Sequence, residues 1–386
     1  MIKTLLVGGT FNNDGGKDSG LIKSIYENMK EDKEFDITYH NGGSMADMPD
    51  ILASVVDYDV VMWFPNVSNE EKKYRTVKEI NPKAILINSK RNDDNKYSFA
   101  ELISRSLAVK ANLTIEFSKV ADFFNMTLFD PLGNVYYEGI KVESLCKALA
   151  GRTKKLLKFT RKPSVRDEEV CGFTIPPEQE FFNFAHNCAD IFHNLIKPAR
   201  GTERFLGNMS FRCQNGFPSF RGPDGVIYVS KRNVNKADID ESSFVHTYLD
   251  ENREVRYCGE NKPSVDTPVQ LRLYDYFPWV NYMIHAHCYV DVSDIEGAVQ
   301  LRTDNPVPCG AIEEVYEILD AYVTSNEKWP YMENRPRLFA VNLIGHGCIL
   351  MASDVEILKE LEKHKDSCFV ARPTPEVFMY EDFCSE

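Results

Sequence analysis

The sequence lacks several features that would mark common classes of protein. No apolar segment approaches the length of about 20 residues that spans a bilayer, and no Cys-x-x-Cys pair occurs among the 10 cysteines. Basic residues are in the minority, because 45 Lys and Arg stand against 58 Asp and Glu and give a formal net charge of −13. These absences argue against a membrane protein, a general nucleic-acid binder and a tetrathiolate metal site.

The start of the chain also lacks the pattern of a signal peptide. Residues 1–7 run directly into Gly8-Gly9 and predict a first strand instead. We therefore expect a cytoplasmic protein, in which the cysteines are mostly reduced packing residues. With 386 residues, of which 43% are hydrophobic, the chain is long enough for two domains with sizeable cores.

Strand and helix patterns alternate over the first part of the chain. Apolar runs at 3–7, 59–64 and 83–88 predict buried strands, and amphipathic stretches between them predict helices. This alternation favours an α/β fold with a Rossmann-like, doubly wound parallel sheet in a domain of residues 1–160.

A glycine- and asparagine-rich loop at residues 8–19 follows the first strand. Doubly wound folds bind nucleotides or phosphates at this position, but the loop matches neither Gly-x-Gly-x-x-Gly nor a Walker A motif. A lid or a partner-contact loop is the alternative. Beyond this domain, the charged residues 161–169 and Pro176-Pro177 predict a linker, followed by a second domain at 177–386.

Three histidines in the second half form the most informative pattern. Residues 282–290 are rich in aromatic and branched side chains and predict a strand, so His285 and His287 would project from the same side. About sixty residues later, His346 stands between two glycines, which allow a sharp turn and a close approach of the backbone. Three imidazoles from two segments can hold a divalent metal ion with one position left open for chemistry. The alternative is that they are ordinary buried histidines.

An acidic residue stands near this pattern in the segment Lys262-Pro-Ser-Val-Asp-Thr-Pro268. Asp266 could join the metal site or act there as an acid/base. Because Pro268 fits the first turn of a helix, Asp266 could instead be the carboxylate that caps that helix.

These motifs carry a resemblance to a known family. The order Gly207-Asn208-x-Ser210-x-Arg212, Asp266, His285-x-His287, Val307-Pro308-Cys309 and Gly345-His346-Gly347 resembles the class II aldolase/adducin family from about Pro177 to Ser353. Within that family, the L-ribulose-5-phosphate 4-epimerases are the most similar. The resemblance implies an α/β/α sandwich with a mostly antiparallel sheet.

The resemblance also implies a cofactor and a chemistry. Zn²⁺ or another divalent transition metal would be bound by His285, His287 and His346, with Asp266 added in epimerase-like members. The reaction would be aldol-type cleavage or 4-epimerisation of a small sugar or sugar phosphate, through an enediolate that the metal stabilises. The family is usually tetrameric with sites between subunits, so the resemblance implies a homo-oligomer. We expect neither a nucleic acid nor a membrane as a binding partner.

Other site residues follow from the family pattern or from nearby charge. The candidates for binding substrate are Asn208, Ser210, Arg212, Ser230, Arg232 and Ser264. The usual phosphate-binding turn, Thr-Pro-Ser/Thr-Gly, is replaced by Ser-Lys-Arg-Asn at 230–233. Lys231 and Arg232 could hold an anionic group there or form a solvated turn.

Two further residues are candidates for proton transfer. Asp304 could replace an acidic catalytic stretch that this chain lacks, and Tyr380 could serve a neighbouring subunit. Two alternatives to an enzyme of this simple kind remain open. The chain could be a non-catalytic, adducin-like binding or scaffold protein, or its first domain could sense a nucleotide and regulate the second.

Overall fold

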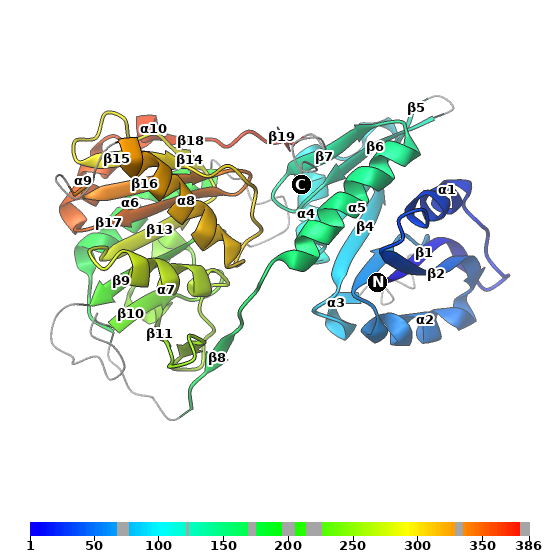
Figure 1. Ribbon diagram of the computed structural model, residues 1–386, viewed down its shortest axis with the longest axis horizontal. Helices are drawn as coiled ribbons and strands as arrows, with labels where there is room; N and C mark the ends of the chain where they lie inside the picture. The colour runs from blue at the N-terminus through cyan, green and yellow to red at the C-terminus, as the bar shows by residue number, and fades with distance from the viewer. Residues whose placement is uncertain are drawn as a thin grey trace. The chain divides into compact units, whose positions relative to one another are not determined.

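The computed structural model describes residues 1–67, 77–120, 123–168, 175–194, 205–213, 226–328 and 335–378. The chain divides into two compact units (Figure 1). The first contains Met1–Lys158 and the chain from Thr374 on, and the second lies between Phe159 and Pro373. The end of the chain thus belongs with the first unit, not with the second as in the expected domain of 177–386. The reason is a strand of only two residues, too short for any sequence periodicity to reveal.

The first unit is built on an eight-stranded sheet in the order β19-β7-β6-β5-β4-β3-β1-β2. Its strands are β1 (Ile2–Asn12), β2 (Phe35–Ser44), β3 (Val60–Trp63), β4 (Ile85–Arg91), β5 (Leu113–Val120), β6 (Phe123–Phe129), β7 (Asn134–Gly139) and β19 (Glu376–Val377). Strands β1 to β5 pair in parallel, whereas β6 and β7 extend the sheet in antiparallel fashion. The predicted Rossmann-like, doubly wound fold is confirmed.

Helices and short 3₁₀ turns connect these strands. They are α1 (Gly20–Met29), η1 (Met45–Asp47), α2 (Met48–Ser54), η2 (Val55–Asp57), α3 (Val77–Ile80), η4 (Asp93–Asn95), α4 (Phe99–Ala108) and α5 (Val142–Lys158). Serines start two of them: the Ser19 side chain accepts a hydrogen bond from Ile22 N, and Ser98 forms a capping box with Glu101.

The second unit contains a nine-stranded, mostly antiparallel sheet in the order β15-β16-β17-β13-β9-β10-β11-β12-β8. Its strands are β8 (Ser164–Arg166), β9 (Asn208–Cys213), β10 (Val226–Ser230), β11 (Phe244–Leu249), β12 (Val255–Tyr257), β13 (Tyr282–Ala286), β15 (Ala298–Arg302), β16 (Leu338–Leu343) and β17 (Gly347–Ala352). A separate pair joins β14 (Tyr289–Val290) to β18 (Phe369–Val370).

Helices cover both faces of this sheet, as the sandwich implied by the family resemblance requires. They are α6 (Gln179–Asn194), α7 (Thr267–Tyr276), α8 (Glu313–Lys328), α9 (Val355–Lys363) and α10 (Lys365–Cys368), with short turns η5 (Lys236–Asp238) and η6 (Glu241–Ser243). One core contains Phe184 of α6 and Leu358 of α9, and another contains Leu271 of α7 and Val315 of α8. The central strands β13, β9 and β17 are therefore held rigidly between two cores.

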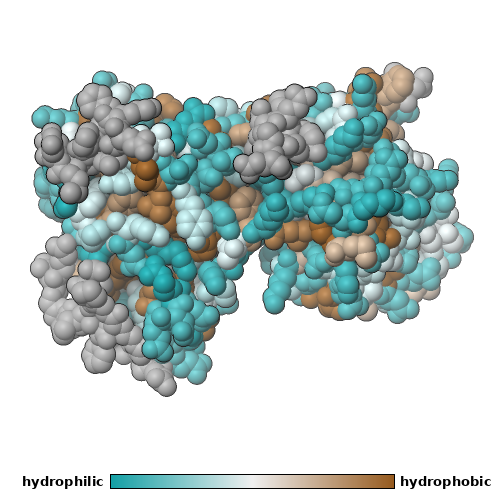
Figure 2. Space-filling view, in the orientation of Figure 1, coloured by the Kyte–Doolittle hydropathy of each residue, from teal (hydrophilic) through white to brown (hydrophobic). Residues whose placement is uncertain are grey.

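Hydrophilic residues cover most of the face seen in Figure 2, where hydrophobic residues show in separate patches. None of the helices in the described part of the chain is long and apolar enough to cross a membrane.

Candidate metal centre

Strand β13 carries the first two histidines to the centre of the second sheet. His285 pairs with Ile349 of β17 on one side and with Asn208 of β9 on the other. His287 follows two residues later, just past the end of the strand, and projects from the same side. Their exposed fractions are 3% and 7%, so both imidazoles lie inside the protein.

The third histidine comes from the turn between β16 and β17. Strand β16 ends at Leu343, which pairs with Gly347, and His346 lies in the turn between them. A Cβ atom at position 347 would lie 2.2 Å from the carbonyl oxygen of Ala286. Only glycine permits this close approach, which places His346 beside the end of β13.

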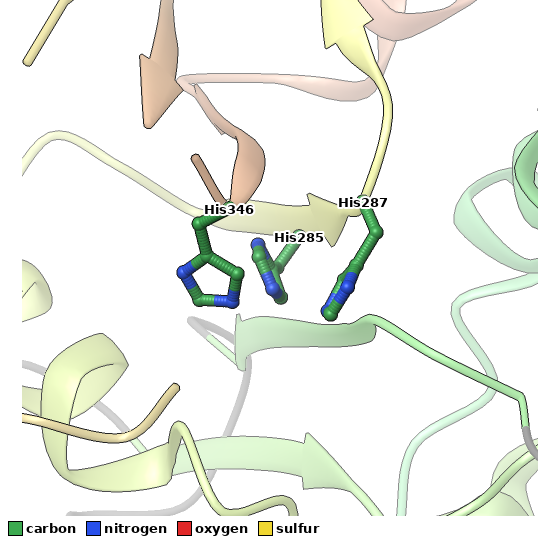
Figure 3. A group of neighbouring side chains, drawn as sticks. All are labelled: His285, His287 and His346. Atoms are coloured by element: carbon green, nitrogen blue, oxygen red, sulfur yellow. The ribbon is translucent and has the colours of Figure 1, made fainter. Parts of the chain in front are cut away.

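The three imidazoles form one cluster (Figure 3). The ring centroids are separated by 4.9 Å for His285 and His287, 4.6 Å for His285 and His346, and 5.0 Å for His287 and His346. One potential ligand atom from each ring lies within 4.8 Å of the other two. Among the residues that the structure describes, no other group of this kind occurs.

The cluster fits a divalent metal. His285 Nδ1 lies 2.9 Å from the carbonyl oxygen of Cys348, a contact that leaves Nε2 as the ring's free nitrogen. That Nε2 is buried and has no hydrogen-bond partner. An unsatisfied buried polar atom costs about 1–3 kcal/mol, a cost that a bound ion would remove. Neutral imidazole nitrogens are suitable ligands for zinc and related metals.

The electrostatics of the cluster differ between the rings. Burial lowers the pKa of His285 and lowers that of His287 well below its usual value, so both are neutral as metal ligands must be. Burial also acts to lower the pKa of His346, but Cys309 and the Glu314 carboxylate outweigh it and hold the pKa well above its usual value.

Asp266 lies at the start of α7, yet its carboxylate does not cap the helix. One oxygen, Oδ2, accepts a hydrogen bond from Asn208 Nδ2 at 2.7 Å and one from Ser264 Oγ at 3.4 Å. The other oxygen, Oδ1, is buried and has no hydrogen-bond partner. The carboxylate is outside the group of mutually close ligand atoms, which contains only the three histidines. It is thus an acceptor with one oxygen held by Asn208 and Ser264 and the other without a partner.

Comparison with known proteins assigns this half of the chain. Residues 188–356 match the family model described as Class II Aldolase and Adducin N-terminal domain. The C-terminal half carries a class II aldolase/adducin domain. The family resemblance expected from the sequence is confirmed, whereas the particular closeness to the epimerases stays a prediction.

Solved structures give weaker similarities. An L-fuculose 1-phosphate aldolase is 18% identical, with a TM-score of 0.30, over 52% of this chain and 94% of its own. A sugar-phosphate aldolase from Thermotoga maritima is 14% identical, with a TM-score of 0.29, over 48% and 93%. The DNA/pantothenate metabolism flavoprotein from Streptococcus pneumoniae is 16% identical, with a TM-score of 0.32, over 40% and 99%. No curated protein matches this chain. At these scores the structural similarities carry no conclusion about activity.

Two of the expected substrate-binding residues of the aldolase/adducin domain contact Asp266, and a third is buried next to Met209. Asn208 and Ser264 donate hydrogen bonds to Asp266, as described above. Ser230 is buried nearby at the end of β10, where its Oγ accepts a hydrogen bond from Met209 N.

Other expected site residues make different contacts in the structure. Ser210 Oγ contacts Tyr274 OH at 3.1 Å, and the Arg212 guanidinium donates to the carbonyl oxygens of Val280 and Tyr274. Their assignment to substrate binding stays a prediction; both side chains are buried and pack against α7, away from Asn208. A strand advances about 3.4 Å per residue, which carries positions 210 and 212 away from Asn208 along β9.

The charged turn after β10 and Asp304 are not part of the cluster either. Lys231 lines a cavity of about 210 Å³ that also includes His246 and Cys258. Arg232 is exposed, and its Nε donates to the carbonyl oxygen of Pro263 at 3.1 Å. Asp304 is exposed, whereas the triad is buried. Tyr380 lies outside the described residues.

Four more residues lie near the cluster; sequence reasoning missed Glu314, Gln270 and Lys236 and placed Cys309 only in a family motif. Glu314 Oε2 lies 2.7 Å from His346 Nδ1, and Cys309 Sγ lies 3.1 Å from His346 Nε2. Gln270 Nε2 donates to Asn208 Oδ1. Lys236 is 2% exposed, and its Nζ donates to the carbonyl oxygens of Leu206 and Gly207, each at 2.8 Å. None stands in a local motif with its partner, although Cys309 is the last residue of the Val307-Pro308-Cys309 match.

Proposed function

We propose that the protein is a metal-dependent enzyme that cleaves or epimerises a small sugar or sugar phosphate. The observation that carries this proposal is the buried histidine triad with the unpartnered Nε2 of His285. The family match supports an enzyme of the aldolase type. A divalent ion in the triad would polarise a substrate carbonyl and the adjacent hydroxyl, and so stabilise the enediolate formed on bond cleavage or proton loss.

The chain's own residues have distinct tasks in this proposal. His285, His287 and His346 hold the ion, and Glu314 orients His346 through Nδ1. Asp266 has one oxygen held by Asn208 and the other without a partner. It is our candidate for moving a proton to or from the substrate, which agrees with its position outside the group of ligand atoms.

Cleavage and epimerisation require the same ion but differ in the fate of the fragment. In an aldolase the carbonyl fragment leaves after the carbon–carbon bond breaks, whereas in a 4-epimerase it rotates and adds again. The observations favour neither outcome, and the proposal includes both. A homo-oligomer with a small sugar or sugar phosphate as its ligand completes the proposal.

Metal analysis combined with a substrate screen tests this function. We expect about one divalent ion per chain in the purified protein and turnover of at least one ketose phosphate. His287→Ala should lose both, whereas His246→Ala, a histidine of the same unit outside the triad, should keep both. Metal retained unchanged in His287→Ala would reject the assignment. An adducin-like scaffold would bind metal weakly or not at all and would turn over none of the sugars.

A further inference from the structure

The turn that leads into α8 lies against the cluster. Pro308 O accepts a hydrogen bond from Ala311 N at 3.2 Å, and Gly310 has a φ of +72°. A Cβ atom at position 310 would lie 2.7 Å from the carbonyl oxygen of Val265. The turn is thereby fixed against the segment that carries Ser264 and Asp266.

This turn brings a thiol to the third histidine. Cys309 Sγ lies 3.1 Å from His346 Nε2, while Glu314, five residues later, contacts His346 Nδ1 at 2.7 Å. Since the carboxylate occupies Nδ1, Nε2 is the nitrogen that remains for a metal. The thiol is therefore placed at the nitrogen of His346 that would hold the ion.

The distance is on the scale of two ligands of one ion. With Zn–N of about 2.0–2.1 Å, Zn–S of about 2.3 Å and a tetrahedral angle, adjacent nitrogen and sulfur ligands lie about 3.5 Å apart. Cys309 Sγ is close to His346 but is not a member of the group whose ligand atoms are all within 4.8 Å. The side chain of Cys309 is only partly buried and has the single χ1 torsion about which its sulfur can move.

The expected fourth ligand is less free to move. Asp266 is at the start of α7, and Asn208 and Ser264 hold its Oδ2. The unpartnered, buried Nε2 of His285 independently indicates that the cluster binds a ligand. A soft thiolate is also a better partner for zinc than for harder ions such as magnesium.

We propose that Cys309 is a fourth ligand of the metal and occupies the open position until a substrate displaces it. The inference rests on the proposed function, because it requires an ion in the triad. When the sulfur–metal bond forms, the thiol proton passes to solvent. When the sulfur leaves, the thiolate regains a proton. Displacing a thiolate favours substrates with two adjacent oxygens, such as a hydroxyl beside a carbonyl, over ligands with a single oxygen.

Cobalt substitution tests this proposal by a readout other than activity. The full-length protein loaded with Co²⁺ should show a thiolate-to-cobalt charge-transfer band in the near ultraviolet. Cys309→Ser should lose the band and still bind about one Co²⁺ per chain. Cys348→Ser is the matched control, because Cys348 is buried beside His285 and its loss should leave the band unchanged. Acetohydroxamate, a bidentate oxygen chelator, should bleach the band.

The outcomes separate the two proposals. Cobalt bound by the wild type without the band, or a band that survives in Cys309→Ser, would overturn the role of Cys309 and leave the metal site intact. Failure of the wild type to bind cobalt would overturn the proposed function and this inference together.

A second measurement covers the case in which Cys309→Ser does not fold. Alkylation of Cys309 by iodoacetamide, followed by mass spectrometry, should be at least tenfold slower in the zinc-loaded wild type than in the metal-free protein. Acetohydroxamate should restore the rate. Equal rates with and without zinc would contradict a bond between Cys309 and the ion.

Discussion

Each unit of the protein contains a buried aspartate, and the two differ in whether both carboxylate oxygens accept hydrogen bonds. Asp130 in the first unit is 7% exposed and accepts four hydrogen bonds: from Leu132 N and Asn134 N at Oδ1, and from Asn134 Nδ2 and Tyr136 OH at Oδ2. Asp266 in the second unit is 6% exposed, and its Oδ1 accepts none.

The comparison separates a structural carboxylate from a functional one. Burying a charged oxygen without a partner is unfavourable, so a fold that needs only stability satisfies both oxygens, as it does at Asp130. Around Asp266 two further buried atoms, Gln270 Oε1 and His285 Nε2, also have no partner. These unpartnered atoms beside the histidine triad support the proposal that an ion and a substrate complete the second unit.

Metal loading should produce the largest difference between the units. An ion at about a thousand times its dissociation constant raises the free energy of unfolding by about 4 kcal/mol, and only the second unit should gain it. Hydrogen exchange measured peptide by peptide with and without zinc checks this. An equal zinc-dependent increase in protection for β1 and β13, or no increase in either, would contradict a metal site in the second unit alone.

Removing the charge should destabilise the fold much more at Asp130 than at Asp266. Asp130→Asn replaces an acceptor by a donor facing Asn134 and Tyr136, and we expect the first unit to lose about 3 kcal/mol. Asp266→Asn keeps an acceptor for Asn208 and relieves a buried charge, so we expect a loss below about 1 kcal/mol in the metal-free protein. Denaturant unfolding followed by hydrogen exchange measures both. A larger loss for Asp266→Asn than for Asp130→Asn would make Asp266 the structural residue.

Glu314 should raise the metal affinity through its contact with His346, although Glu314 itself does not bind the ion. Partners of this kind typically change affinity 10- to 100-fold, so Glu314→Gln should weaken zinc binding by about 2 kcal/mol. Competition with a chromophoric chelator measures the affinity. Glu317→Gln, one turn along α8 and bound to Asn305, is the control and should bind zinc like the wild type. Unchanged affinity in Glu314→Gln would show that this contact serves only packing.

The buried lysine should give the second unit a pH dependence that the first lacks. Burial lowers the pKa of Lys236 to about 7, although Asp266 opposes the shift. Because this pKa lies below the usual lysine value of about 10.4, the unfolded chain binds the extra proton between these limits. The metal-free second unit should therefore gain about 1 kcal/mol of stability per pH unit between about pH 8 and 9.

The variant Lys236→Met should remove that gain, and Lys363→Met, an exposed lysine on α9, should keep it. Thermal unfolding at a series of pH values measures the slope. An identical slope for the wild type and Lys236→Met would show that the charge of Lys236 is not suppressed in the fold.

Much of the second unit could be predicted because its signals are local. Strand alternation brings His285 and His287 to one side, and the glycines around His346 allow the turn that the structure shows. The start of a helix after Asp266 also follows from Pro268 alone. The motif order identified the family without any knowledge of distances.

The residues that sequence reasoning did not place at the cluster make contacts with residues that are distant along the chain. Glu314 and Cys309 meet His346 across more than thirty residues, and Lys236 reaches Gly207 across a stretch that includes β9 and β10. Ser210 and Arg212 share a strand with Asn208 and seemed equivalent in the motif, but the strand carries them under α7.

The sequence by itself determined the kind of fold in both halves, the family of the second half and the residue types able to bind a metal. Periodicity, glycine spacing and motif order are properties of short segments, and they can be recognised in the sequence without coordinates. The tertiary structure alone decided which polar atoms are satisfied and which are not. That distinction belongs to the packing of β13, β9, α7 and the β16–β17 turn against one another, because a hydrogen-bond partner is defined by position in space and not by position in the chain.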